Sequence, residues 1–134
     1  MQTNRMLVAG LAATMLALGA ARASAQVVDT TKLGAAPDST LLKPEIIDGG
    51  RKIFHGRGTC LACHGDKLQG GPIAPALVGP NWRHIDGTFA AMVNRITNGL
   101  QGTVMPARPG GISEQQVLMV ATYVYAVSHL HAVP

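Results

Sequence analysis

The chain has 134 residues, enough for one domain, and carries 11 Lys and Arg against 7 Asp and Glu. With only two cysteines, it does not have the disulfide framework of a small secreted scaffold. Its basic residues are not clustered, which excludes the charged patch that a nucleic-acid-binding surface needs.

The first 25 residues have the pattern of a secretory signal peptide. Arg5 precedes an uncharged apolar run over residues 6–21, and Ala23-Ser24-Ala25 is typical of a cleavage site before Gln26. The run is shorter than the roughly 20 apolar residues of a membrane span. We therefore expect cleavage, rather than retention as an anchor helix, and export to the periplasm with no membrane span in the mature chain.

The next segment, residues 26–43, has no sustained hydrophobic period, which predicts an arm or linker ahead of a domain over residues 44–134. Pro44 and Glu45 are typical of the first turn of a helix. Apolar residues then recur at helical spacing as far as Phe54, and Gly56 ends the helix.

Two more helices are predicted further along the chain. Apolar residues repeat at three- and four-residue intervals over residues 88–98, and Ser113 with Gln116 forms a capping box that opens a helix to about Ser128. Gly- and Pro-rich loops, residues 70–80 and 99–111, separate these helices. The pattern predicts an all-α fold whose small core is completed by something other than its own side chains.

Both cysteines lie in the stretch CLACH, residues 60–64, directly ahead of His64. A thioredoxin-like redox pair would follow a strand, and no strand pattern precedes this motif. Structural zinc needs four ligands, and the motif supplies three. The third interpretation is covalent haem attachment, with thioethers from Cys60 and Cys63 to the haem vinyl groups and His64 as an axial iron ligand. Export and the lack of other cysteines favour this interpretation, with one haem c.

The residue opposite His64 decides between electron transfer and ligand chemistry. Met92 and Met119 lie on or near apolar helix faces, where methionine fills a core. Met105 lies in a Gly/Pro-rich loop, and a role as the sixth iron ligand would explain its place there. His84 is the main alternative, and an open sixth site is the other.

These motifs resemble class I c-type cytochromes, specifically the small bacterial periplasmic kind, over residues 44–130. GRKIFHGRGTCLACHG, APALVG, TVMPA and VATYVYAVS occur in the order in which that family has its N-terminal helix, proline segment, methionine loop and closing helix. The resemblance implies a cytochrome c fold around one haem. It also implies that the Pro75 carbonyl accepts a hydrogen bond from His64, and that Tyr123 packs on Gly50 and Phe54. Ala74 stands where the family often has glycine.

The resulting interpretation is an exported electron carrier with His64/Met105 ligation, acting between redox donor and acceptor proteins as a monomer and not as an enzyme. Trp82, the sole tryptophan, is assigned to the haem pocket. Arg57, Lys67 and Arg108 are candidates to surround the exposed haem edge. One alternative is a dedicated cytochrome subunit of a periplasmic dehydrogenase or oxidase, with the 26–43 arm as its docking element. Another is a haem gas sensor or peroxidase with an open sixth site.

Overall fold

A computed structural model describes Asp29 and residues 32–134, so the predicted signal segment lies outside the described residues. The elements are α1 (Pro44–His55), the single turn α2 (Leu61–His64), α3 (Phe89–Asn98), a 3-10 turn η2 (Pro109–Gly111) and α4 (Glu114–His129). The described part of the chain contains no strand. The three long helices match the predicted ones within about one residue at each end.

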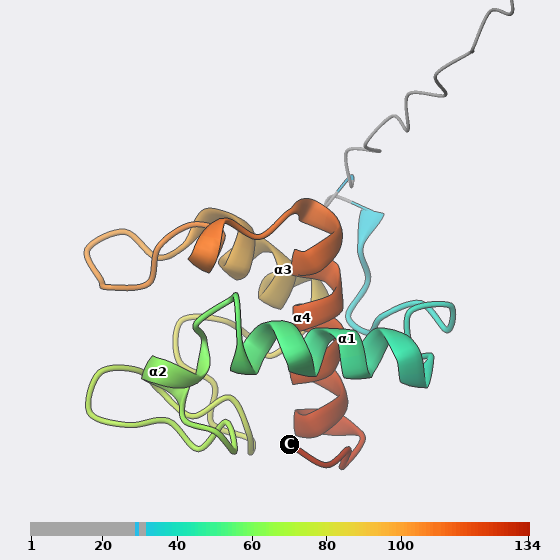
Figure 1. Cartoon of the computed structure of the whole chain (residues 1–134), viewed down its shortest axis with the longest axis horizontal. Helices are drawn as coiled ribbons and strands as arrows, with labels where there is room; N and C mark the ends of the chain where they lie inside the picture. Colours follow the sequence, from blue (N-terminus) through green and yellow to red (C-terminus); the bar gives the residue numbers. More distant parts are fainter. Residues whose placement is uncertain (1–28, 30–31) are drawn as a thin grey trace, which may run out of the picture.

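Helix α4 is the centre of the fold and packs against both α1 and α3. Figure 1 shows α4 crossing behind α1 at a steep angle. The crossing is close because Gly50 faces α4: a Cβ there would overlap the Met119 carbonyl and lie 2.8 Å from Tyr123 Cβ. Next to it, the rings of Phe54 and Tyr123 meet edge to face with centroids 5.6 Å apart. The expected packing of Tyr123 on Gly50 and Phe54 is therefore confirmed.

Side chains fix where the helices begin. The Thr88 hydroxyl accepts a hydrogen bond from Ala91 N at 3.3 Å, and caps α3. At α4 the predicted capping box is present, with Gln116 N donating to Ser113 Oγ at 3.2 Å and Ser113 N donating to Gln116 Oε1 at 3.0 Å. The capping box explains why the start of α4 could be predicted from sequence, whereas the start of α3 was predicted from its apolar repeat.

The segment ahead of α1 contacts the helices. The backbone N–H groups of Phe89 and Ala90, in the first turn of α3, donate to the carbonyls of Ala35 and Gly34 at 2.9 and 3.1 Å. Leu33 and Leu41 pack, partly buried, against the hydrophobic core. Residues 33–41 therefore satisfy backbone donors that a helix start leaves unpaired.

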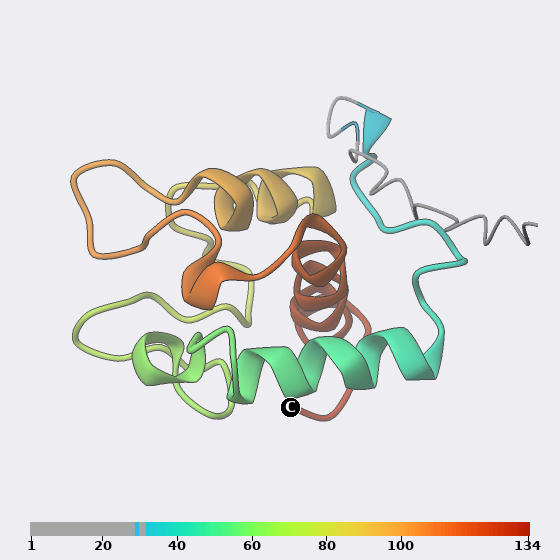
Figure 2. The same cartoon turned by 45° about the horizontal axis from the view of Figure 1, so that its top comes forward.

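Two long loops extend to the same side of the helices, one between α2 and α3 and one between α3 and α4 (Figure 2). The buried core, in contrast, is formed chiefly by α1, α3 and α4. Among the described residues, no helix combines the length and apolarity of a transmembrane span.

Replacement of Gly50 by alanine should destabilise the protein by about 2–3 kcal/mol, because the added methyl group meets backbone that has no room to move. Thermal unfolding followed by circular dichroism measures this as a lower Tm. Gly34→Ala is the matched control, since its Cβ meets nothing closer than 3.6 Å. Equal Tm values for the two variants would contradict this account of the helix crossing.

Candidate functional site

A cavity of about 740 Å³ lies between the two loops and the helices. This volume is within the range of pockets that hold small molecules and cofactors. Its lining is mostly apolar and comes from the end of α1, from the CLACH turn, from both loops, from α3 and from α4. Cys60, Cys63, His64, Pro75, Trp82 and Met105, the site residues predicted from the sequence, all belong to the lining.

The CLACH turn places three reactive groups at the cavity wall. Backbone bonds from Cys63 N and His64 N to Cys60 O, at 3.2 and 2.9 Å, close the single turn of α2. Both cysteines are unpaired and half-buried. Burial raises the pKa of the Cys60 thiol to about 11. A redox-active cysteine needs a lowered pKa instead, so the geometry does not support a thioredoxin-like role.

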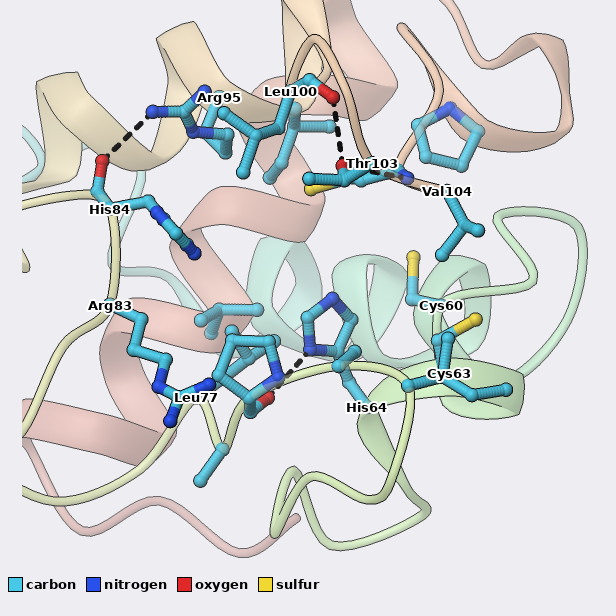
Figure 3. Close-up of a pocket in the computed structure, with 18 of the residues that line it drawn as sticks. Cys60, Cys63, His64, Leu77, Arg83, His84, Arg95, Leu100, Thr103 and Val104 are labelled. Atoms are coloured by element: carbon cyan, nitrogen blue, oxygen red, sulfur yellow. Dashed lines mark hydrogen bonds between the residues drawn. The ribbon is translucent and has the colours of Figure 1, made fainter.

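The His64 ring is held in one orientation. Its Nδ1 lies 2.9 Å from the Pro75 carbonyl, the contact that the sequence resemblance implies. A carbonyl oxygen only accepts, so Nδ1 carries the proton and Nε2 keeps its lone pair. Burial lowers the pKa of His64, against the opposing effect of the Pro75 bond, and so favours the neutral ring. Figure 3 shows this ring projecting into the cavity, with the dashed line marking the Pro75 bond. His64 is thus arranged as a metal ligand would be.

Met105 follows His64 along the chain. It lies in a loop whose backbone is hydrogen-bonded to the residues at the end of α3. Leu100 N donates to Met105 O at 3.1 Å, and Met105 N donates to Thr103 Oγ1 at 3.2 Å. The Thr103 hydroxyl in turn donates to Leu100 O at 2.7 Å. Gly99 starts the loop with φ of +67°, and its absent Cβ would lie 2.6 Å from Ala107 N and 2.7 Å from Met105 O. The Met105 backbone is therefore fixed by neighbours on both sides.

The other two methionines in the described part of the chain pack in the helical core or at its edge. Met119 lies in the α1–α4 contact, where its Cε occupies the space beside Gly49. Met92 is 3% exposed and belongs to the core, although it also lines the cavity. The core role expected from their helix positions is thus present for Met92, whereas Met119 fills the contact between α1 and α4.

Three of the other histidines have different surroundings. His84 lines the cavity and points into it in Figure 3, with its backbone at φ of +66°. His129 is exposed, and its ring stacks on Tyr125 with centroids 4.3 Å apart. The two ring nitrogens of His55 each lie 2.9 Å from a carbonyl, of Arg51 and of Asp66, so this side chain links α1 to the loop after the CLACH turn. The sequence indicated only a surface position for His55.

The basic side chains that line the cavity are not the ones named for the exposed haem edge. Arg57, Lys67 and Arg108 are absent from the cavity wall, and Arg108 donates to Glu114 at 2.8 Å. Arg83, His84 and Arg95 line the cavity instead. Figure 3 shows these three at the end opposite Cys60 and Cys63. Arg95 was not among the predicted site residues, because it lies beside the apolar face of its helix. A basic residue next to that apolar face is the signal in the sequence that could have identified it.

The lining fits a haem. Two thiols stand at one end of an apolar cavity and an imidazole with a free ring nitrogen projects into it. At the other end two arginines, Arg83 and Arg95, line the cavity. A flat apolar cofactor with acidic groups on one edge matches each of these features.

Comparisons with known proteins point to one family. The family model described as cytochrome c oxidase, cbb3-type, subunit III matches residues 45–124. The cbb3-type cytochrome c oxidase subunit FixP of Bradyrhizobium sp. strain ORS 278 is 38% identical over 80 residues, 58% of this chain and 26% of that protein. Cytochrome c-554(548) of Halomonas halodenitrificans is 31% identical over 67 residues, 49% of this chain and 81% of the relative. The chain thus spans about a quarter of FixP and most of the small cytochrome.

Solved structures show the same fold. Cytochrome cL of Methylophaga aminisulfidivorans matches with a TM-score of 0.57 at 21% identity, covering 64% of this chain and 55% of that one. Cytochrome cL of Hyphomicrobium denitrificans matches with a TM-score of 0.53 at 18% identity, covering 78% and 70%. The predicted all-α cytochrome c fold is confirmed.

Replacement of Gly99 by alanine should disturb the Met105 loop and lower the Tm. Gly99 and Gly102 share a positive φ, which costs an alanine roughly 1–2 kcal/mol. Only Gly99 also faces backbone within 2.7 Å, whereas nothing lies within 4 Å of a Cβ at Gly102. Thermal unfolding of Gly99→Ala and Gly102→Ala should differ by about 1–3 kcal/mol, the cost of the added contact. A Gly102 variant as unstable as the Gly99 variant would rule this explanation out.

Proposed function

The chain belongs to the family described as cytochrome c oxidase, cbb3-type, subunit III, and we propose that it is an exported monohaem electron carrier with His64 and Met105 as axial iron ligands. Haem c, when bound, supplies a one-electron couple between ferrous and ferric iron. The observation that carries the proposal is the fixed His64 ring, whose free nitrogen faces a cavity that Met105 also lines.

The CLACH turn holds the cofactor covalently in this proposal. Cys60 and Cys63 form the two thioethers, and one helical turn sets their separation. Pro75 keeps His64 in the orientation in which Nε2 binds iron, because its carbonyl accepts the hydrogen bond from Nδ1–H. Trp82, which lines the cavity, forms part of the pocket wall.

Met105 closes the sixth position. A thioether ligand favours ferrous iron, so His/Met ligation raises the reduction potential relative to a bis-histidine site. Two protein ligands also leave no open position for a gas or a peroxide. This arrangement supports electron transfer over the alternative of a gas sensor or peroxidase, and a carrier over an enzyme.

The proposed partners are redox proteins. The proposed location is the periplasm, and the chain is proposed to act as a monomer. A second candidate function, a dedicated subunit of an oxidase complex, is favoured by the family match and by the name of the FixP relative. FixP is about four times as long as its matched region, so the complex to which that relative belongs is carried over only as this alternative.

Met105→Ala should open the sixth position in the holoprotein. Cyanide then binds the ferric protein readily, and the reduction potential falls because the thioether no longer favours ferrous iron. Met105→His should also lower the potential, yet keep the site closed. Redox titration and cyanide titration of each purified variant measure both effects.

Met92→Leu and Met119→Leu are the matched controls, because volume-conserving core changes usually cost under ~1.5 kcal/mol. Both should leave the potential and cyanide binding unchanged. The ligand assignment is wrong if Met105→Ala behaves like these controls, or if His84→Ala has the effects expected of Met105→Ala.

A further inference from the structure

The His55 ring lies between two backbone carbonyls. Its Nδ1 is 2.9 Å from the carbonyl of Arg51, four residues earlier in α1, and its Nε2 is 2.9 Å from the carbonyl of Asp66. The ring is partly buried, and it meets Tyr123 on α4 edge to face with centroids 6.0 Å apart. Each ring nitrogen therefore has one fixed partner, and the two partners are of the same chemical kind.

These two partners determine the charge of the ring. A carbonyl oxygen accepts hydrogen bonds and cannot donate them, so each nitrogen of His55 has to carry a proton to make its bond. A neutral imidazole has one N–H group, and its other nitrogen would direct a lone pair at a carbonyl oxygen 2.9 Å away. A partly buried acceptor left without its donor costs more than an ordinary hydrogen bond gains. The imidazolium, with two N–H groups, satisfies both carbonyls.

His64 shows the opposite arrangement. Its Nδ1 meets one carbonyl, that of Pro75, while its Nε2 is free to bind a metal. One N–H group is enough there, and burial lowers the pKa of the His64 ring. The hydrogen-bond partners thus distinguish a neutral histidine, which can act as a ligand, from a charged histidine, which links two segments of the chain.

The charged and titratable groups around His55 are compatible with a positive ring. The Arg51 side chain is ion-paired with Asp48, with 3.6 Å between nitrogen and oxygen. Asp66 carries an exposed carboxylate, whose charge is opposite to that of an imidazolium. Burial raises the pKa of Tyr123, which meets the ring from α4, so this side chain is a neutral phenol. The two carbonyls therefore decide the charge of the ring.

We propose that His55 is an imidazolium in the folded protein, and that its two N–H groups position the haem-attachment turn. The Asp66 contact joins the end of α1 to the second residue after His64, and so closes residues 56–65 into one loop. That loop contains both cysteines and the histidine of the CLACH motif. The charge of the ring follows from the hydrogen bonds alone, whereas its role in holding haem rests on the proposed function.

Two backbone hydrogen bonds beside Asp66 report whether this link is closed. Gly70 N donates to the His64 carbonyl at 2.7 Å, and Leu68 N donates to the Gly65 carbonyl at 3.2 Å. Both bonds lie in the segment that Asp66 joins to α1. The rates at which these two amide hydrogens exchange with solvent therefore measure the local opening of the segment.

The first test measures the charge of His55 by nitrogen-15 NMR of the ferrous holoprotein at pH 7.5. The two nitrogens of an imidazolium have similar chemical shifts, whereas those of a neutral ring differ widely, and His55→Gln identifies the signals by their loss. The folded protein should show the imidazolium pattern. The same chain unfolded in urea should show the neutral one, since an unperturbed histidine is half-protonated at about pH 6.5. A neutral pattern for His55 in the folded protein overturns the inference.

The second test separates the two hydrogen bonds by substitution. Glutamine places an amide nitrogen near the position of Nε2, and asparagine places one near that of Nδ1, so His55→Gln should keep the Asp66 contact and His55→Asn should lose it. Amide exchange at Gly70 and Leu68 should be about tenfold faster in His55→Asn than in His55→Gln, which is the effect of losing one hydrogen bond. His131→Asn is the matched control, because His131 is exposed in the C-terminal tail.

The positioning role is overturned if His55→Asn exchanges no faster than His131→Asn, or if His55→Gln exchanges faster than His55→Asn. If neither His55 variant folds, the nitrogen shifts of the wild type alone support or overturn the inference. A wild-type protein without covalent haem would refute the proposed function, and the nitrogen shifts would still decide the charge of His55.

Discussion

The fold depends on a cavity that its own side chains leave open. Helices α1, α3 and α4 bury a core around Phe54, Tyr123 and Phe89, but the two long loops stand over about 740 Å³ lined mainly by apolar groups. Apolar surface left facing such a space gives up the contacts that stabilise a packed interior. A flat apolar cofactor supplies them, so in this account haem completes the core as well as carrying the electron.

Different groups of residues form the two ends and the two faces of the cavity. The CLACH turn forms one end of the cavity, and the Pro75 carbonyl fixes the orientation of the His64 ring. The Met105 loop is held together by hydrogen bonds of Leu100 and Thr103, and it lines the same cavity. Arg95 stands at the far end and contacts the root of that loop. The Arg95 guanidinium therefore connects the Met105 loop, through the Gly99 carbonyl, to the His84 carbonyl in the loop before α3.

The features that were predictable from sequence are those encoded by near neighbours. The CLACH turn, the capping box of Ser113 and Gln116, and the glycine that ends each of the first two long helices all act over a few residues. Contacts between distant segments were not predictable: the carbonyls of Gly34 and Ala35 that cap α3, and His55 with Asp66. Arg95 belongs to this second group, because its guanidinium contacts the His84 carbonyl in the loop that precedes its helix. Pro75 and Tyr123 were reached only through resemblance to a family.

Haem is proposed to complete the core, and the folding of the chain without haem tests this most directly. Far-UV circular dichroism of the haem-free chain, heated alongside the holoprotein, is the measurement. This account predicts weak helical signal and no cooperative transition in the haem-free chain, with a cooperative transition in the holoprotein. A haem-free chain that shows full helical signal and melts cooperatively would contradict it.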